Sequence, residues 1–383
     1  MRVFLIAGEP SGDVLGGRLI TALRHLVPHV TVDGVGGTQM ADAGLVSRFP
    51  MAELSLMGVA EVLPHLPRLI RRIGETAAAV RETRPDVLVT IDAPAFTLRV
   101  AKRLAGIGVP RVHYVAPQVW AWRAGRAKHL ADAVDALLCL LPFEPPWFTP
   151  HGLDARFVGH PVVEAGIAAG DRHRFRARHG LGERPVLVVL PGSRRGELRR
   201  HLPVFKATVA DILAAAPEVQ VVIPTLAHLM GAITAATADW PGSPLVVSGE
   251  QDKHDAFRAA DAALAASGTV ALELALAGCP SVIAYRVNPL TAALARRLLT
   301  THYVSLPNII ADRVIYPECL QERCAPGPLV AELMPLLREP SARRAQRSAL
   351  ADVATALGDG GEAPSVRAGK AVLDIIAAGS LIR

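Results

Sequence analysis

Short apolar runs rich in valine, isoleucine and alanine alternate with longer amphipathic stretches along most of this chain. Apolar runs without a polar face are typical of parallel strands that helices cover on both sides. The repeated strand–helix alternation therefore predicts an α/β fold with parallel sheets. The runs predict strands at Val3–Ala7, Val30–Gly34, Asp86–Ile91, Arg111–Val115, Ala136–Leu141, Arg156–Val158, Val186–Leu190, Val219–Pro224, Leu245–Ser248, Ala262–Ala266 and Ser281–Tyr285.

A polar, arginine-rich stretch, Gly170–Arg184, separates a first series of these units from a second. We predict two Rossmann-like, doubly wound domains, over residues 1–165 and 166–357, whose ligand crevices face a central cleft. The helical tail, residues 358–383, is expected to pack back on an N-terminal domain. Whether it does so within one chain or is exchanged in a homodimer stays open. Helices are predicted at Asp13–Leu26, Leu66–Thr83, Phe96–Ala105, Pro328–Leu337, Ser341–Leu357 and Pro364–Ala378.

Composition narrows the function classes. Hydrophobic residues make up 51% of the chain and charged residues 20%, so both domains can bury a core. The net charge of +6 comes from scattered basic residues, which argues against nucleic acid and suits a phosphate-bearing substrate or an anionic membrane. The first apolar run is too short for a signal peptide, no segment is long enough to span a bilayer, and four cysteines lack CxxC spacing. We therefore expect a cytoplasmic protein.

Two loops of the first domain combine glycine turns with carboxylates where ligands of doubly wound sheets bind, beyond the carboxyl ends of the strands. Gly8 to Asp13 follows the first strand and contains Glu9 and Ser11. Asp92 ends the third strand, where a general base would face the crevice. The alternatives are that Ser11 or Asp13 caps the next helix and that Asp92 is an ordinary turn residue.

The second domain offers two anion-binding turns. Gly192-Ser193-Arg194 suits a diphosphate, because a backbone turn and a guanidinium can both approach it. Ser267-Gly268-Thr269 opens a helix on which Glu273 lies one turn further, placed to accept ribose hydroxyls. A solvent-facing arginine and simple capping are the alternatives. The absence of a lysine-bearing P-loop, a DxD pair and metal-ligand spacing indicates a nucleotide-diphosphate site without a metal.

These loops belong to longer motifs that together resemble the lipid-A-disaccharide synthase family, whose members are GT-B-fold glycosyltransferases. The resemblance spans nearly the whole chain and is most specific in the stretches around Trp120 and Asn308. The motifs lie at 7–13, 34–37, 57–62, 91–94, 113–123, 190–194, 266–269, 303–308 and 317–321.

The resemblance implies an inverting transfer from UDP-2,3-diacylglucosamine to 2,3-diacylglucosamine 1-phosphate, which forms a β-1,6 disaccharide and UDP without a cofactor. It implies Asp92 as the base or orienting group, with Glu9 and Asn308 also needed for activity, and Arg194 and Glu273 on the nucleotide. Ala95-Phe96-Thr97 replaces the Asp-Phe-Asn usual in the family, which leaves Asp92 as the sole local carboxylate. Further substrate contacts are implied for Ser11, Asp13, Gln118, Trp120, Glu318 and Gln321.

An apolar stretch with basic flanks, Leu54 to Ile73, fits both lipid substrates. We expect it to lie on the cytoplasmic surface of the inner membrane and to accept acyl chains. An ordinary helix packed on the sheet is the alternative, but Pro64 and Pro67 argue against one continuous helix. The apolar members expected at the membrane are Met57, Val62, Leu63, Leu66, Leu69 and Ile70.

Two other functions are compatible with single motifs. A different UDP-hexosamine enzyme, such as a peptidoglycan glycosyltransferase or a UDP-sugar 2-epimerase, would explain the turn at 267–269 and Glu273. It would not explain the stretches at 113–123 and 303–308. A non-catalytic nucleotide-binding module would bind UDP without turnover and would leave the Asp92 loop unexplained.

Overall fold

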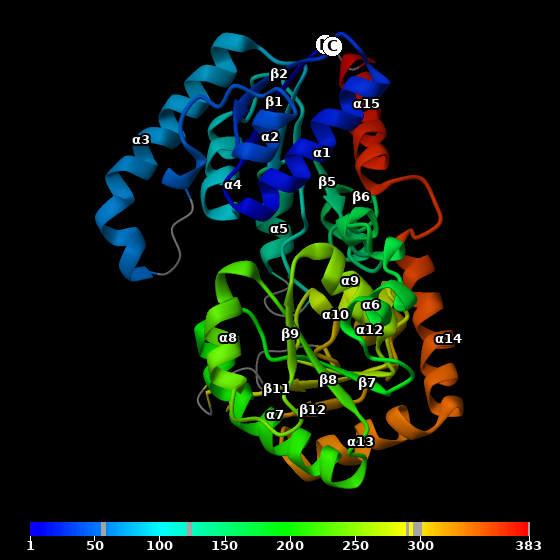
Figure 1. The fold of residues 1–383 in the computed structure, drawn as a ribbon. Helices are drawn as coiled ribbons and strands as arrows, with labels where there is room; N and C mark the ends of the chain where they lie inside the picture. Colours follow the sequence, from blue (N-terminus) through cyan, green and yellow to red (C-terminus); the bar gives the residue numbers. More distant parts are fainter. Residues whose placement is uncertain (55–58, 121–124, 289–290, 294–300, 382–383) are drawn as a thin grey trace. The chain divides into compact units, whose positions relative to one another are not determined.

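The computed structural model describes residues 1–54, 59–120, 125–288, 291–293 and 301–381, which form two compact units (Figure 1). The first unit contains Met1–Pro161 together with Gly360–Arg383, and the second contains Val162–Asp359. Each unit holds one six-stranded sheet, and all strand pairs are parallel. Among the described residues, no helix is both long enough and apolar enough to cross a membrane.

The sheet of the first unit has the strand order β2-β1-β3-β4-β5-β6. Its order reverses between β1 and β3, so the carboxyl ends of these two strands form a topological switch point, where ligands of such sheets bind. The loops that carry Glu9 and Asp92 leave the sheet at this point. The strands are β1 (Arg2–Ala7), β2 (Thr31–Val35), β3 (Val87–Ile91), β4 (Arg111–Tyr114), β5 (Ala136–Cys139) and β6 (Asp154–Phe157).

Helices cover both faces of this sheet (Figure 1). Alternate residues of β1 point to opposite faces: Leu5 packs in a core with α1 and α15, and Phe4 in a second core with α3 and α4. The chain's last helix packs against its first, where Gly369 lets α15 approach: a Cβ there would lie 3.1 Å from Cδ1 of Leu26. The helices are α1 (Pro10–Leu26), α2 (Thr38–Asp42), α3 (Val59–Thr83), α4 (Pro94–Arg103), α5 (Arg126–Ala131) and α15 (Pro364–Leu381).

The expectation that Pro64 and Pro67 prevent one continuous helix is wrong, because both lie inside the single helix α3. A proline inside a helix removes one backbone hydrogen bond and tends to bend it. The rest of α3 offsets that cost: Ile73, Ala77 and Val80 are buried in the core shared with α4. The tertiary packing of the last turns therefore decides the conformation, and the local proline signal does not.

The second unit has the strand order β12-β11-β10-β7-β8-β9, which is the order of a dinucleotide-binding Rossmann sheet. Its switch point lies between β7 and β10, and the turns at Gly192 and Gly268 follow these two strands. The strands are β7 (Val186–Leu190), β8 (Gln220–Thr225), β9 (Leu245–Ser248), β10 (Ala262–Ala265), β11 (Ser281–Tyr285) and β12 (Glu318–Leu320). The helices are α6 (Arg172–His179), α7 (Arg195–Ala215), α8 (Met230–Thr237), α9 (Glu250–Ala259), α10 (Val270–Leu276), α12 (Leu306–Ala311), α13 (Pro326–Arg338) and α14 (Pro340–Leu357).

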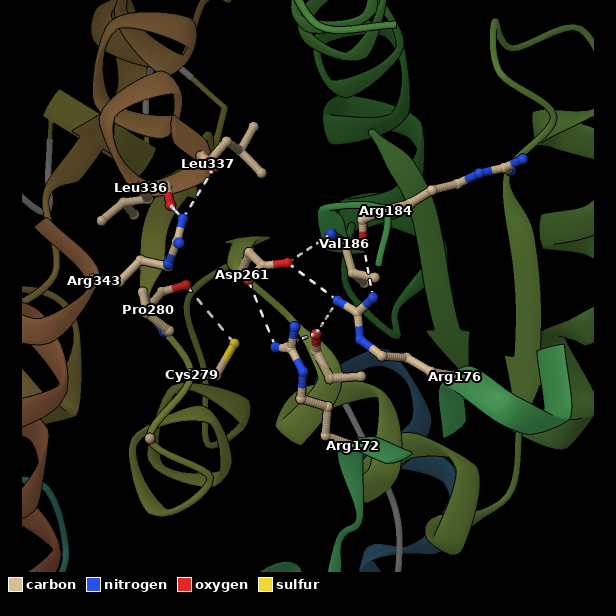
Figure 2. Close-up of polar contacts among 12 residues, drawn as sticks. Arg172, Arg176, Arg184, Val186, Asp261, Cys279, Pro280, Leu336, Leu337 and Arg343 are labelled. Atoms are coloured by element: carbon tan, nitrogen blue, oxygen red, sulfur yellow. Dashed lines mark hydrogen bonds and ion pairs between the residues drawn. The ribbon is translucent and has the colours of Figure 1, made fainter. Parts of the chain in front are cut away.

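The arginine-rich stretch that resembles a linker in the sequence is part of the second unit. Its helix, α6, is held by Asp261, a buried carboxylate just before β10 (Figure 2). Asp261 accepts a hydrogen bond from the Val186 amide of β7 at 3.0 Å and pairs with Arg176 at 3.3 Å and with Arg172 at 3.6 Å. Buried arginine thus serves here to fasten a helix to the sheet.

Candidate active site

In the first unit, the loops after β1 and β3 touch at the switch point of the sheet. Gly8 makes this possible, because a Cβ at its position would lie 2.6 Å from Cβ of Ala93, closer than side chains approach. Any larger residue would push the Glu9 loop away from the Asp92 turn. The sequence thus brings its two predicted catalytic carboxylates to adjoining loops.

Asp92 occupies a strained turn. Its φ is 49° and that of Ala93 is 45°, both in the left-handed region that residues with a Cβ seldom adopt. The turn is held by its own bonds: the Ala93 amide donates to Asp92 Oδ1 at 2.9 Å, and the Thr97 hydroxyl donates to the Asp92 carbonyl at 2.7 Å. The Asp92 amide also donates to the Tyr114 carbonyl of β4 at 3.0 Å. Strain of this kind is concentrated at functional sites, where the surroundings enforce one side-chain direction.

Glu9 is half-buried at the amino end of α1, and its side chain makes no capping hydrogen bond within the described part of the chain. Burial raises its pKa, and the negative charge of Asp92 raises it further. This electrostatic coupling corrects the expectation that Asp92 is the sole local carboxylate. The neighbour comes from the first loop, where the family motif provides Glu9, and not from the replaced position Ala95.

The two other polar residues of the first loop have different environments. Ser11 is exposed in the first turn of α1. Asp13 is 3% exposed, and its carboxylate accepts hydrogen bonds from the Gly37, Gln39 and Met40 amides at 2.7 to 3.1 Å. It therefore caps α2, not the helix on which it lies, and its predicted contact with the substrate stays a prediction.

The stretch around Trp120 likewise contains one exposed and one buried candidate residue. Gln118 is exposed beyond β4, whereas Trp120 is 5% exposed and donates its indole N–H to Glu144 Oε1 at 3.3 Å. Glu144, which the sequence interpretation missed, also accepts from the Leu140 and Leu141 amides at 3.0 and 2.9 Å. Trp120 thus has a packing role, and its predicted contact with the substrate stays a prediction. Burial raises the pKa of Glu144 to about 7, against the opposing effect of these hydrogen bonds.

His113, the first residue of the motif at 113–123, lies inside the first unit. It is 1% exposed, and its Nδ1 lies 2.8 Å from the Thr90 hydroxyl. Burial lowers its pKa to about 4, so the ring is neutral at physiological pH. A buried, neutral imidazole that is bonded to a neighbouring strand does not favour proton transfer to a substrate, which leaves Asp92 and Glu9.

In the second unit, the turn after β7 exposes the side chain of Arg194, whereas two of its backbone amides are bonded within the protein. The Arg194 side chain is 81% exposed. Gly192 has a φ of 110°, and the Ser193 and Arg194 amides donate to Glu197 Oε2 at 3.1 and 3.2 Å. Glu197 thus occupies the amides of Ser193 and Arg194, and the expected contact of Gly192 and Ser193 with a diphosphate stays a prediction. The spacing of Glu197 three residues after the cap, a capping-box signal, would have indicated this.

His201 fastens this turn to the next strands of the sheet. It is fully buried, its Nδ1 lies 3.0 Å from the Pro191 carbonyl, and its Nε2 lies 3.1 Å from the Arg286 amide. The carbonyl requires a proton on Nδ1 and the amide requires a lone pair on Nε2, so the ring is neutral, in keeping with a pKa lowered by burial. Arg200 donates to the Arg286 carbonyl at 3.0 Å, a contact that the sequence interpretation missed.

The turn after β10 is open. Ser267 is half-buried and donates to the Val304 carbonyl at 3.4 Å, whereas Gly268 and Thr269 are exposed before α10. Glu273, one turn into α10, is 21% exposed and pairs with Lys253 of α9 at 2.9 Å. Lys253 is a further residue that motif reasoning missed, because it lies on a helix without a recognised motif.

The asparagine motif forms a closed network. Asn308 is fully buried: its Nδ2 donates to the Tyr316 carbonyl and to Glu318 Oε1, and its Oδ1 accepts from the Ile315 and Tyr316 amides, all at 2.8 to 2.9 Å. Glu318 also accepts from the Val304 and Ser305 amides at 2.9 to 3.1 Å. These groups hold the loop between α12 and β12, and the predicted catalytic role of Asn308 and substrate contact of Glu318 stay predictions.

Gln321 is equally occupied. Its φ is 49°, and its side-chain amide pairs with both backbone groups of Val287, at 3.3 and 3.2 Å. It thereby joins the chain after β11 to the chain after β12, and its predicted contact with the substrate stays a prediction.

The predicted membrane residues lie on α3, with one exception. Met57 lies outside the described residues, and Val62 and Leu63 belong to the first turns of the helix. Leu69 is partly buried against the core and Leu66 is half-buried, and the membrane contacts expected of both stay predictions. Ile70 is 49% exposed, and it is flanked by exposed Arg68 and Arg71.

Arg72, a third basic residue of this stretch, has a structural role. It pairs with Glu53 at 2.8 Å and with Glu75 at 2.8 Å, and its guanidinium lies 4.4 Å from the centre of the Phe49 ring. The exposed surface of α3 is therefore narrower than the sequence indicates.

Comparison with known proteins assigns the family. The model of the lipid-A-disaccharide synthetase family matches residues 3–363. A lipid-A-disaccharide synthase from Rhodospirillum centenum is 53% identical over 378 residues, which cover 98% of this chain and 94% of the relative. The fold is similar to that of UDP-GlcNAc 2-epimerase from Neisseria meningitidis (TM-score 0.60, 10% identity, 99% and 100% coverage). It is also similar to that of the calicheamicin glycosyltransferase CalG4 (TM-score 0.57, 18% identity, 98% of each chain). The fold is GT-B, and the chain belongs to the lipid-A-disaccharide synthetase family.

Proposed function

We propose that this chain transfers the sugar of UDP-2,3-diacylglucosamine to 2,3-diacylglucosamine 1-phosphate. The products are the β-1,6-linked disaccharide 1-phosphate of lipid A and UDP. The observation that carries the proposal is membership of the family over nearly the whole chain. The residues at the two switch points supply the chemistry that such a transfer requires.

Asp92 is the proposed base of the first unit. The acceptor's 6-hydroxyl oxygen attacks C1 of the donor sugar and gives its proton to the Asp92 carboxylate, while the bond from C1 to the UDP oxygen breaks on the opposite face. Attack opposite the leaving group inverts the configuration at C1. The raised pKa of Glu9 supports Asp92 as the base, because of the two carboxyls Glu9 has the greater tendency to be already protonated.

The second unit holds the departing UDP. Arg194 is the proposed contact of the diphosphate, because its guanidinium is exposed beside the switch point and a guanidinium can bond two phosphate oxygens. The turn from Ser267 to Thr269 is the second phosphate contact, and Glu273 accepts the ribose hydroxyls. These groups neutralise the leaving group without a metal ion or another cofactor.

Membrane association is assigned to α3. Ile70 would enter the interface of the inner membrane's cytoplasmic leaflet, while Arg68 and Arg71 contact anionic headgroups. Arg71 lies 3.5 Å from Glu75, so its charge is partly compensated. For the homodimer that an exchanged tail would produce, light scattering of the purified chain is the test.

The deciding experiment is mass spectrometry of the purified protein incubated with both acylated glucosamine substrates. Formation of the disaccharide 1-phosphate together with UDP supports the proposal. UDP release without an acceptor, or epimerised UDP-sugar, contradicts it. Asp92→Asn should lower turnover by about two to four powers of ten and leave the melting temperature unchanged. Asp42→Asn, on the exposed surface of α2, is the matched control with normal turnover.

A further inference from the structure

Three charged side chains meet at the amino ends of α9 and α10. Lys253 Nζ lies 2.8 Å from Glu250 Oε2 and 2.9 Å from Glu273 Oε2. The exposed fractions differ: 22% for Lys253 and 21% for Glu273, but 70% for Glu250. The pair formed by Lys253 and Glu273 is thus largely shielded from water, whereas Glu250 is a solvent-facing partner.

The backbone brings Lys253 to this position. Gly249, with a φ of 99°, turns the chain sharply after β9, so that α9 begins at once and Lys253 falls in its first turn. Glu273 lies in the first turn of α10, after the open turn that follows β10. Both helices start at the carboxyl edge of the sheet, on which the proposed nucleotide site lies.

Only one oxygen of Glu273 is engaged. Oε2 faces Lys253, and within the described part of the chain Oε1 has no hydrogen-bond donor. A carboxylate that must accept hydroxyls needs a fixed direction, and a shielded ammonium on its other oxygen provides it. The same ammonium offsets a carboxylate charge that would otherwise repel an anionic diphosphate.

The simpler explanation of the contact between Lys253 and Glu273 is an ion pair that only stabilises the fold, but two arguments count against it. Exposed pairs contribute little to folding, and a shielded one often recovers no more than its cost of desolvation. In addition, Glu250 already supplies Lys253 with a partner in water, so burial of Glu273 against it is not needed to satisfy the ammonium.

We propose that Lys253 is the positioning residue that fixes Glu273 for recognition of the ribose diol and so makes the site selective for ribonucleotides. This inference rests on the proposed UDP site. Lys253 itself does not contact the nucleotide. Its removal should therefore reduce the preference for a ribose hydroxyl, while binding of the base and the diphosphate remains.

The test is calorimetric titration of the full-length protein with UDP and with 2′-deoxy-UDP. The wild type should bind UDP about tenfold or more tightly than the deoxy analogue, as expected for a hydroxyl bonded to a carboxylate. Lys253→Met should lower this ratio to within about threefold of unity, as should Glu273→Gln. Lys253→Arg should restore most of it, because a guanidinium also holds the carboxylate. The ratio is informative even if part of a variant is misfolded, since both ligands report on the same folded fraction.

A matched control is Lys206→Met, which removes a solvent-facing lysine paired with Asp239 elsewhere in the second unit and should keep the wild-type ratio. The inference is overturned if Lys253→Met keeps the wild-type ratio while Glu273→Gln loses it. It is also overturned if Lys253→Met weakens UDP and 2′-deoxy-UDP equally. If the wild type binds neither nucleotide, it is the proposed function that fails.

Discussion

Replacement of Asn308 by alanine separates a structural role from a catalytic one. The Asn308 side chain is fully buried and makes four hydrogen bonds of 2.8 to 2.9 Å. Alanine leaves the Ile315 and Tyr316 amides without their acceptor. Each buried, unpaired amide costs about 1–3 kcal/mol, so the unfolding free energy should fall by about 2–6 kcal/mol. Glu318 keeps its bonds from Val304 and Ser305 and adds little to this loss.

The assay is urea unfolding followed by circular dichroism, together with the initial rate of UDP release. Asn308→Ala should lose stability and turnover together, whereas Asp92→Asn should lose turnover alone. Asn308→Asp is a sharper variant, because it keeps the acceptor for both amides but places an oxygen where Nδ2 now donates to Glu318 at 2.9 Å.

Two carboxyls at that distance favour a shared proton, so a folded-state pKa rises above its unfolded value. Asn308→Asp should therefore be nearly normal at pH 5 and increasingly unstable toward pH 8. An Asn308→Ala variant with the wild-type urea midpoint but no turnover would refute the structural role and indicate that Asn308 contacts the substrate.

Three further outcomes are expected. Ile70→Ser should lower binding to anionic vesicles in a flotation assay, whereas Val46→Ser, an 86% exposed valine of the same unit, should leave it unchanged. The folded-state pKa of Glu144 is about 7, above the ordinary value of 4.5, so its stabilising effect is complete below about pH 4.5 and is lost as the pH rises through 7. The unfolding free energy of the wild type should thus decline relative to Glu144→Gln over that range, by an amount on the order of 3 kcal/mol, and parallel pH profiles would contradict this. Turnover should survive dialysis against EDTA, because Arg194 supplies the charge on the leaving group.

The sheets could be predicted because their strands are buried on both faces, which leaves an apolar run that does not depend on distant residues. Leu245–Ser248 and Ser281–Tyr285 have the bounds that the sequence predicts. The short edge strand Glu318–Leu320 was missed, since three residues at an edge carry no period. The two prolines of α3 led to a wrong prediction of a broken helix. Their local preference was outweighed by the burial of Ile73 and its neighbours in the core.

The candidate site was predictable to the level of loops but not of atoms. A motif places Arg194 at a strand end and the spacing of Glu197 indicates a capping box, but the exposure of the Arg194 guanidinium is visible only in the structure. The same holds for Glu9, whose coupling to Asp92 arises between loops that are more than eighty residues apart in the chain.

Motif residues differ in how they can act, and hydrogen-bond capacity distinguishes them. An asparagine has two donors and one acceptor oxygen, and Asn308 uses both ends on the protein's own backbone and Glu318. The Asp13 carboxylate similarly accepts hydrogen bonds from three backbone amides. By contrast, Arg194 is exposed, and Glu273 keeps an oxygen without a donor among the described residues. The motifs of this chain therefore combine groups whose bonding capacity is used within the protein and groups that retain it, and we expect the second kind to contact the substrate.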